Sequence, residues 1–139
     1  MTTDSGWALQ AGLYAHLTAT SVLTSQLADG ANSILDHVPG GTPFPYIVLG
    51  EMTSKPSDTH TFSGNDAVVT LHVFSRVKGL QETKNILSAI HDAVHNADIP
   101  VEDHTLVLCQ HQQTDVFLES DGLTRHGVIR FRMITEPTA

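Results

Sequence analysis

The clearest hydrophobic pattern lies in the middle of the chain and predicts a β-strand followed by a helix. Alternate residues of segment 67–74 point to opposite faces of an extended chain, and both faces are largely apolar. One face carries Val69, Leu71 and Val73, and the other carries Val68, His72 and Phe74. After Gly79, one helix face gathers Ile86, Leu87, Ile90 and Val94. Burying these four side chains contributes about 6 to 12 kcal/mol, so this strand and helix are expected to form the nucleus of the fold.

The N-terminal part of the chain predicts one helix and two strands. A helix is expected over residues 6–17, with Asp4 or Ser5 as its cap. Its residues at helical spacing are Trp7, Ala11, Tyr14, Ala15 and Leu17 or Thr18. Val22, Leu23 and Leu27 indicate a further helical turn or two that ends at residues 29–30. Residues 34–38 form a short strand candidate, and residues 46–52 predict a second strand that is apolar on both faces.

The C-terminal part predicts a long loop and a hairpin. Residues 53–65 are rich in Thr, Ser, Asp, Pro and Gly without periodicity, which indicates a loop of the kind that is usually functional or mobile. Residues 105–109 and 116–118 are expected to be strands separated by polar residues 110–115. Residues 120–122 (SDG) are a hairpin-turn signal. The return strand places Ile129, Phe131 and Met133 on one face, and Val128, Arg130, Arg132 and Ile134 on the other.

This order of elements predicts one α+β domain over residues 1–139. Its sheet is mainly antiparallel, with four to five strands and two helices packed on one face. Two helices cover only one face, yet the strands at 46–52 and 68–74 are apolar on both. The second face therefore needs another cover, and a partner subunit is the economical candidate.

Composition and charge narrow the function classes. Seven Lys and Arg against fifteen Asp and Glu give a net charge of −8, which argues against a protein that grips nucleic acid phosphates. The same sign suits a conduit through which DNA slides without sticking. No apolar run approaches the roughly 20 residues of a membrane span, and the N-terminus lacks the features of a secretory signal, so we expect the chain to stay in the cytoplasm. Cys109 is the only cysteine, and we expect it to be a buried thiol in a strand.

Two histidines raise the question of a metal site. His91 and His95 stand four residues apart and resemble the H-E-x-x-H pattern of metalloproteases, with Asp92 in place of Glu. Asp is one methylene shorter than the usual general base, and no third ligand follows at a recognisable spacing. We therefore interpret both as surface residues on a helix flank and predict neither a metal nor another cofactor. A small metal-dependent hydrolase that uses His91 and His95 is the alternative from a different class.

The remaining histidines and the arginines of the last strand carry no recognisable catalytic arrangement. Core or surface positions account for the other scattered histidines, which are His37, His60, His72, His104, His111 and His126. Arg130 and Arg132 are expected to pair either with Asp115 or Glu119 across the ladder or with another subunit.

A series of short sequence segments, taken in their order along the chain, resembles a known family. The segments are residues 44–51 (FPYIVLGE), 71–76 (LHVFSR), 89–95 (AIHDAVH), 115–117 (DVF), 121–122 (DG) and 126–132 (HGVIRFR), with Glu82 and Lys84 between the second and the third. Together they resemble the tail-terminator or tail-completion proteins of long-tailed phages and gene transfer agents. The resemblance covers about residues 9–136, and residues 78–80 (KGL) stand where such proteins often carry a Gly-Gly-Arg turn.

The resemblance implies a structural virion protein and no enzyme. It implies a ring, expected to be a hexamer, at the head-proximal end of the tail, at the head-tail junction, assembled in the cytoplasm of the host bacterium. The ring ends polymerisation of the tail tube protein and joins the tail to the head connector or stopper protein, while DNA passes through its lumen without specific binding. A head-to-tail joining role in the same family is the near alternative, and a generic oligomeric binding module is a further class.

Two sets of residues follow as expected contact sites. Neighbouring subunits are expected to meet on the second sheet face, through Tyr46, Val48, Val68, Phe74, Arg130 and Arg132. The long loop is expected to contact the tail tube, through Lys55, Phe62 and Asn65.

Overall fold

The computed structural model describes residues 4–58 and 63–138, which form a five-stranded sheet with helices. The elements in chain order are α1 (Gly6–Thr18), α2 (Ser21–Thr24), the 3-10 helix η1 (Gly30–Ser33), β1 (Ile34–Leu35), β2 (Tyr46–Pro56), β3 (Asn65–Ser75), α3 (Gln81–Val94), β4 (His104–Leu118) and β5 (Arg125–Pro137). The strands lie in the order β1-β2-β3-β5-β4. β1 runs parallel to β2, and the other pairings are antiparallel. The α+β class is confirmed, with a mixed sheet.

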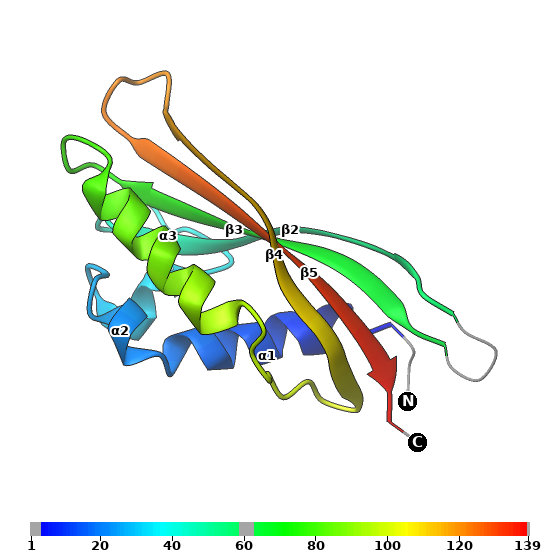
Figure 1. Cartoon of the computed structure of the whole chain (residues 1–139). Coiled ribbons are helices and arrows are strands. Elements are labelled where there is room, and N and C mark those ends of the chain that lie inside the picture. The colour runs from blue at the N-terminus through cyan, green and yellow to red at the C-terminus, as the bar shows by residue number, and fades with distance from the viewer. Residues whose placement is uncertain (1–3, 59–62, 139) are drawn as a thin grey trace.

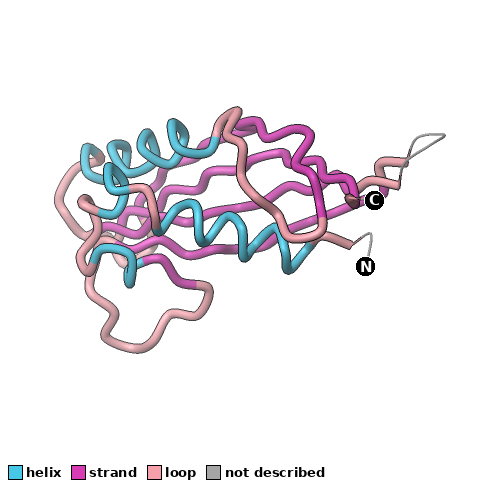
Figure 2. Tube along the Cα trace, turned by 90° about the horizontal axis from the view of Figure 1, so that it is seen from below, coloured by secondary structure: helices cyan, strands magenta, loops and turns pink. Residues whose placement is uncertain are grey.

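All three α-helices lie on one face of the sheet (Figure 1). Figure 2 shows α1 and α3 in front of the strands when the molecule is seen from below. The predicted stripe of α3 is buried against β3, β5 and β4, and the predicted inner face of β3 is buried beneath it. Gly127 permits this close packing, because a Cβ there would lie 2.8 Å from Cδ1 of Leu87. The short α2 is the further helical turn that we expected at Val22 and Leu23, but it ends at Thr24 and not at residues 29–30.

The buried face of α1 differs from the predicted one. Leu9, Leu13 and Leu17 face the core, whereas Trp7 and Tyr14 are exposed. The physical reason is Gly12, which lies on the leucine side and lets the helix approach residues 99–100. A Cβ at that position would lie 2.5 Å from the Pro100 carbonyl oxygen. The aromatic residues of the helix are therefore left on its outer side.

The segment 53–65, which we predicted to be a long loop, is strand at both of its ends. Residues 53–56 continue β2 and pair with residues 65–68 of β3, so that the connection shortens to residues 57–64. The prediction was wrong because backbone hydrogen bonds of the antiparallel ladder hold these residues whatever their side chains. Of the predicted tube-contact residues, Lys55 is exposed on β2, and Asn65 begins β3 and donates to the Ser5 hydroxyl at 3.2 Å. Phe62 lies outside the described residues.

β4 and β1 also depart from the predicted boundaries. β4 is one continuous strand, whereas we expected two strands separated by residues 110–115. It is an edge strand that pairs only with β5 in the sheet, so polar side chains are tolerated along it. β1 keeps only two of the five residues expected over 34–38.

Two further features of the described chain bear on the predictions. Cys109 is a buried thiol in β4, as expected, and burial raises its pKa to about 11. Within residues 4–58 and 63–138, the helices are too short or too polar to cross a bilayer.

Candidate functional site

The sheet face opposite the helices, called the open face here, carries a row of aromatic side chains. Tyr46, Phe74, His126 and Phe117 are backbone register partners across β2, β3, β5 and β4. Their ring centroids are separated by 5.3 Å between Tyr46 and Phe74, 4.4 Å between Phe74 and His126, and 4.7 Å between His126 and Phe117. We call these four residues the aromatic strip. It crosses four adjacent strands without a gap.

Phe44 and Arg76 extend the aromatic strip at the β2 end. The Phe44 ring lies 5.0 Å from the Tyr46 ring, and the guanidinium carbon of Arg76 lies 4.4 Å from the Phe44 ring centroid. Arg76 also donates from Nε to the Thr124 hydroxyl at 3.1 Å, and its other end lies 3.8 Å from the Asp121 carboxylate. A cation held over an aromatic face adds a modest attraction and fixes the ring. The strip is therefore anchored to the β4–β5 turn.

His126 of the aromatic strip and the neighbouring His72 form a chain of hydrogen bonds that ends in a carboxylate on each side. Nε2 of His72 lies 2.7 Å from Glu51, Nδ1 of His72 lies 2.7 Å from Nε2 of His126, and Nδ1 of His126 lies 2.6 Å from Glu119. Gly50 makes room for this arrangement, because a Cβ there would lie 2.5 Å from the His72 ring. The chain links β2, β3, β5 and the end of β4.

The hydrogen bonds of this chain determine how many protons the two rings hold. The carboxylates accept, so His72 donates from Nε2 and His126 donates from Nδ1. The bond between the rings then needs one further proton, which gives the pair a single positive charge. Burial lowers the pKa of His126, and its bond to Glu119 opposes that effect. The hydrogen bond from His72 in turn lowers the pKa of Glu51.

The other end of the open face is ionic. Arg132 donates to both carboxylate oxygens of Asp66, from Nε at 3.1 Å and from the terminal nitrogen at 2.8 Å, and these bonds lower the pKa of Asp66. Arg130 lies 3.5 Å from Asp115, which is one of the pairings that we expected. Asp66 as the partner of Arg132 was not predicted, because it comes from the neighbouring strand β3.

The structure brings all six predicted interface residues onto the open face. Tyr46 and Val48 come from β2, Val68 and Phe74 from β3, and Arg130 and Arg132 from β5. Sequence reasoning placed His72 on this face beside Val68 and Phe74, but it missed the contributions of His126 and Phe117. The alternation of side chains along each strand shows which residues of that strand share a face. To place residues of different strands side by side on one face, the register between the strands is also needed.

His91 and His95 lie away from the open face, at the end of α3. Their rings are stacked with centroids 5.0 Å apart, and His111 of β4 lies 5.0 Å from His91. The interpretation of His95 as a solvated flank residue was wrong, because it is half-buried and its Nδ1 accepts a hydrogen bond from the backbone of His111 at 3.0 Å. In the described ranges, no three His, Cys, Asp or Glu side chains are placed to hold one metal ion. His95 helps to cover the edge of β4 instead.

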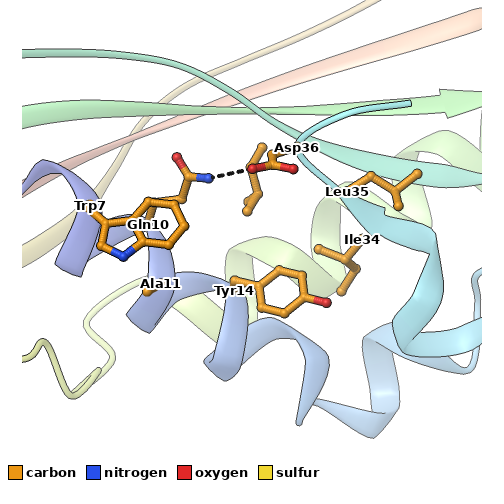
Figure 3. Close-up of a pocket in the computed structure, with 8 residues that line it drawn as sticks. Trp7, Gln10, Ala11, Tyr14, Ile34, Leu35 and Asp36 are labelled. Carbon is orange, nitrogen blue, oxygen red and sulfur yellow. Dashed lines mark hydrogen bonds between the residues drawn. The ribbon is translucent and has the colours of Figure 1, made fainter. Parts of the chain in front are cut away.

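A groove opens on the helix side, between α1 and β1 (Figure 3). Its volume is about 420 Å³, and Trp7 and Tyr14 of α1 stand opposite Leu35 and Asp36 in the close-up. Gln10 donates to the Asp36 carboxylate across the groove at 3.2 Å. The site was missed in the sequence because Trp7 and Tyr14 were expected to belong to the core-facing pattern.

Comparison with known proteins identifies the family. Residues 11–136 match the family described as tail completion protein gp17. The tail completion protein gp17 of Bacillus phage SPP1 is 26% identical over 106 residues, which cover 76% of this chain and 78% of that protein.

Two solved structures share the fold. A chain in the virion of a native gene transfer agent particle has a TM-score of 0.87 at 24% identity, covering 97% of this chain and 99% of that one. The structure of the bacteriophage SPP1 gp17 protein has a TM-score of 0.62 at 23% identity, covering 95% of each chain. Since the family match spans most of the sequence, the chain belongs to the tail completion protein gp17 family.

Proposed function

We propose that the protein forms a ring at the head-proximal end of a phage or gene transfer agent tail. In this position it ends polymerisation of the tail tube and joins the tail to the head connector. The ring is expected to be a hexamer and to lie at the head-tail junction. The observation that carries the proposal is the aromatic strip, which runs across a sheet face on the side away from the helices.

The open face has the composition of an interface between subunits. Aromatic residues and arginine are enriched at such interfaces, and large apolar patches are rarely left in contact with water. Here the aromatic strip occupies one end, and the Arg132–Asp66 and Arg130–Asp115 pairs occupy the other. A neighbouring subunit on this face would remove the aromatic rings from water and leave the ion pairs at the rim.

The charge of the chain suits the proposed path of DNA. A ring of chains that each carry a net charge of −8 repels phosphate and leaves DNA free to slide through its lumen. Lys55 on β2 and Asn65 on β3 are, together with Phe62 outside the described residues, the proposed contact with the tail tube. The effect of the protein then lies in occupying the surface where the next tube subunit would add, without a catalytic step.

A joining protein of the same family is the near alternative. Such a protein would connect heads to tails without setting tail length. Tail length and head attachment, measured separately, distinguish these roles.

The experiment introduces a charge into the aromatic strip of the protein in assembling particles. Phe74→Asp places an unpaired carboxylate at the proposed interface, which costs several kcal/mol when it is buried there. Val107→Asp is the matched control, because Val107 is exposed on β4 outside the aromatic strip. We expect the Phe74 variant to give tails of irregular length and unjoined heads, as seen by electron microscopy, and the Val107 variant to give normal particles. Normal particles from a folded Phe74 variant would contradict the proposal.

A further inference from the structure

The groove between α1 and β1 has an apolar floor and a charged wall. Trp7, which is 73% exposed, and Tyr14 form its helix side. Ile34, Leu35 and Leu49 line it from the sheet, and Asp36 is exposed beside them. A large aromatic side chain that is mostly exposed at the rim of an apolar hollow is typical of a protein-protein contact.

A second exposed apolar feature lies at the end of the β4–β5 hairpin. We call residues 118–125 the hairpin tip, which projects beyond the helices in Figure 1. Leu118 and Leu123 are 51% and 59% exposed there. The tip is nevertheless rigid, because Asp121 accepts hydrogen bonds from the backbone of Leu123 and Thr124 at 2.8 Å and from the Thr124 hydroxyl at 2.7 Å. An exposed apolar side chain on a pre-ordered turn loses little freedom when it docks.

The groove and the hairpin tip are different surfaces on different parts of the molecule. Figure 1 places the tip at the upper left and α1 along the lower side. Contact between them therefore requires two copies of the chain. Such a head-to-tail contact is heterologous, and it generates a closed ring when the rotation between subunits closes.

Charge along the chain favours the same pairing. Residues 1–54 contain no Lys or Arg. This part of the chain therefore places no basic side chain beside Asp36 in the groove. The hairpin tip carries Arg125, which donates to the Leu123 carbonyl at 2.9 Å and has no carboxylate partner within the described part of the chain. Between chains of strongly negative net charge, contacts that place a cation against an anion offset the general repulsion.

We propose that the groove between α1 and β1 of one copy receives the hairpin tip of the next copy. Leu123 enters between Trp7 and Leu35, and Arg125 faces Asp36. Phe117 of the aromatic strip directly precedes the tip in the chain, so the tip adjoins the strip. This inference rests on the proposed ring and assigns the two surfaces that close it.

The small size of this contact predicts that the ring forms on the tail tube. One turn in a groove of about 420 Å³ is expected to bury less than the roughly 1,200 to 2,000 Å² of a stable interface. A single contact is therefore weak, whereas contacts made around a closed ring on the tail tube support one another. The free protein is expected to be a monomer at low concentration.

The first test uses disulfide cross-linking in assembled particles. Leu123→Cys places a thiol on the tip, and Trp7→Cys places one at the groove. The native Cys109 does not compete, because it is buried and its pKa is about 11. After mild oxidation, the double variant is expected to give a ladder of covalent oligomers, and each single variant is expected to remain monomeric.

A matched control fixes the position of the contact. Val22 is 69% exposed on α2, outside the groove, so Val22→Cys combined with Leu123→Cys is expected to give no ladder. Dimers of the Leu123→Cys variant alone would show that tips meet each other and would overturn the inference. An equal ladder from the Val22 pair, or a cross-link from Trp7→Cys to another virion protein, would also overturn it.

A charge exchange in the same double-cysteine background provides an independent test. Asp36→Arg and Arg125→Asp are each expected to reduce the cross-linked ladder several-fold, and their combination is expected to restore it. Continued loss in the combination, with the fold intact by circular dichroism, would contradict the proposed contact. Electron microscopy of the particles distinguishes a failure of this inference from a failure of the proposed function. A ring without a Trp7–Leu123 cross-link overturns only this inference, whereas the absence of a ring overturns the proposed function as well.

Discussion

The imidazole rings of His72 and His126 hydrogen-bond to each other across β3 and β5, with 2.7 Å between Nδ1 of His72 and Nε2 of His126. Each ring also bonds to a carboxylate on its far side. This arrangement leaves room for one shared proton, so a second proton would place two N–H groups against each other. The hydrogen bonds between these side chains of the open face therefore depend on pH.

The pH dependence of stability follows from the lowered pKa of His126. Between the lowered pKa of His126 in the folded state and the usual histidine pKa of about 6.5, the unfolded state binds more protons than the folded state. The contribution of His126 to the free energy of unfolding is thus present at neutral pH and lost as pH falls through the folded pKa. We expect His126→Gln to show a shallower decrease than the native protein in urea unfolding between pH 7.5 and 5.5. Identical slopes would contradict the lowered pKa of His126.

Gly50 is predicted to be required for the position of His72. A methyl group at Gly50 would overlap the imidazole ring, so Gly50→Ala should lower the free energy of unfolding by about 1 to 3 kcal/mol. Gly40→Ala is the matched control, because a Cβ at Gly40 meets nothing within 4 Å. Denaturant unfolding measures both variants. An equal stability of the two would show that His72 moves aside without cost.

Asp121 is predicted to hold the hairpin tip in place. Backbone hydrogen bonds from Thr124 and Leu123 lower its pKa to about 2. Its contribution to stability is therefore present above about pH 4 and is lost as pH falls from about 4 through the folded pKa of about 2. Asp121→Ala should speed amide hydrogen exchange across residues 118–125, while Ser120→Ala should not. Unchanged exchange at Leu123 and Thr124 in the Asp121 variant would count against this role.

His91 and His95 are predicted to be dispensable for particle assembly. Replacing both by Ala should leave tail length and head joining unchanged, although the His111 amide loses its acceptor and should exchange faster. Zinc analysis by mass spectrometry of the native protein provides the metal readout. Stoichiometric zinc that the double variant loses together with function would favour the hydrolase instead.

The pattern of apolar residues was sufficient to predict the helices and strands, but not how far the strands extend at the edges of the sheet. The stripe of α3 and the two faces of β3 and β5 were readable because apolar residues recur there at the period of the element. The strand extensions at 53–56 and 110–115 were missed because backbone pairing holds them, while their side chains meet solvent. α1 contains two sets of apolar residues at helical spacing, and the close approach at Gly12 selects the leucines. That approach depends on residues 99–100, far away in sequence.

The open face was predicted only in part, for a related reason. Apolar residues on both sides of β2 and β3 indicated an uncovered face, and the chain places the six expected residues there. The hydrogen-bonded histidines depend on register across strands more than 50 residues apart in sequence. Neither composition nor spacing carries that information.

Electron microscopy of particles from a genome that lacks this gene tests the central claim most directly. The proposed function predicts tails of irregular length, heads without tails, and recovery of both defects when the native gene is supplied. Intact particles should show a ring with a central channel at the head-proximal end of the tail. Tails of uniform length joined to filled heads in the absence of the protein would contradict the account.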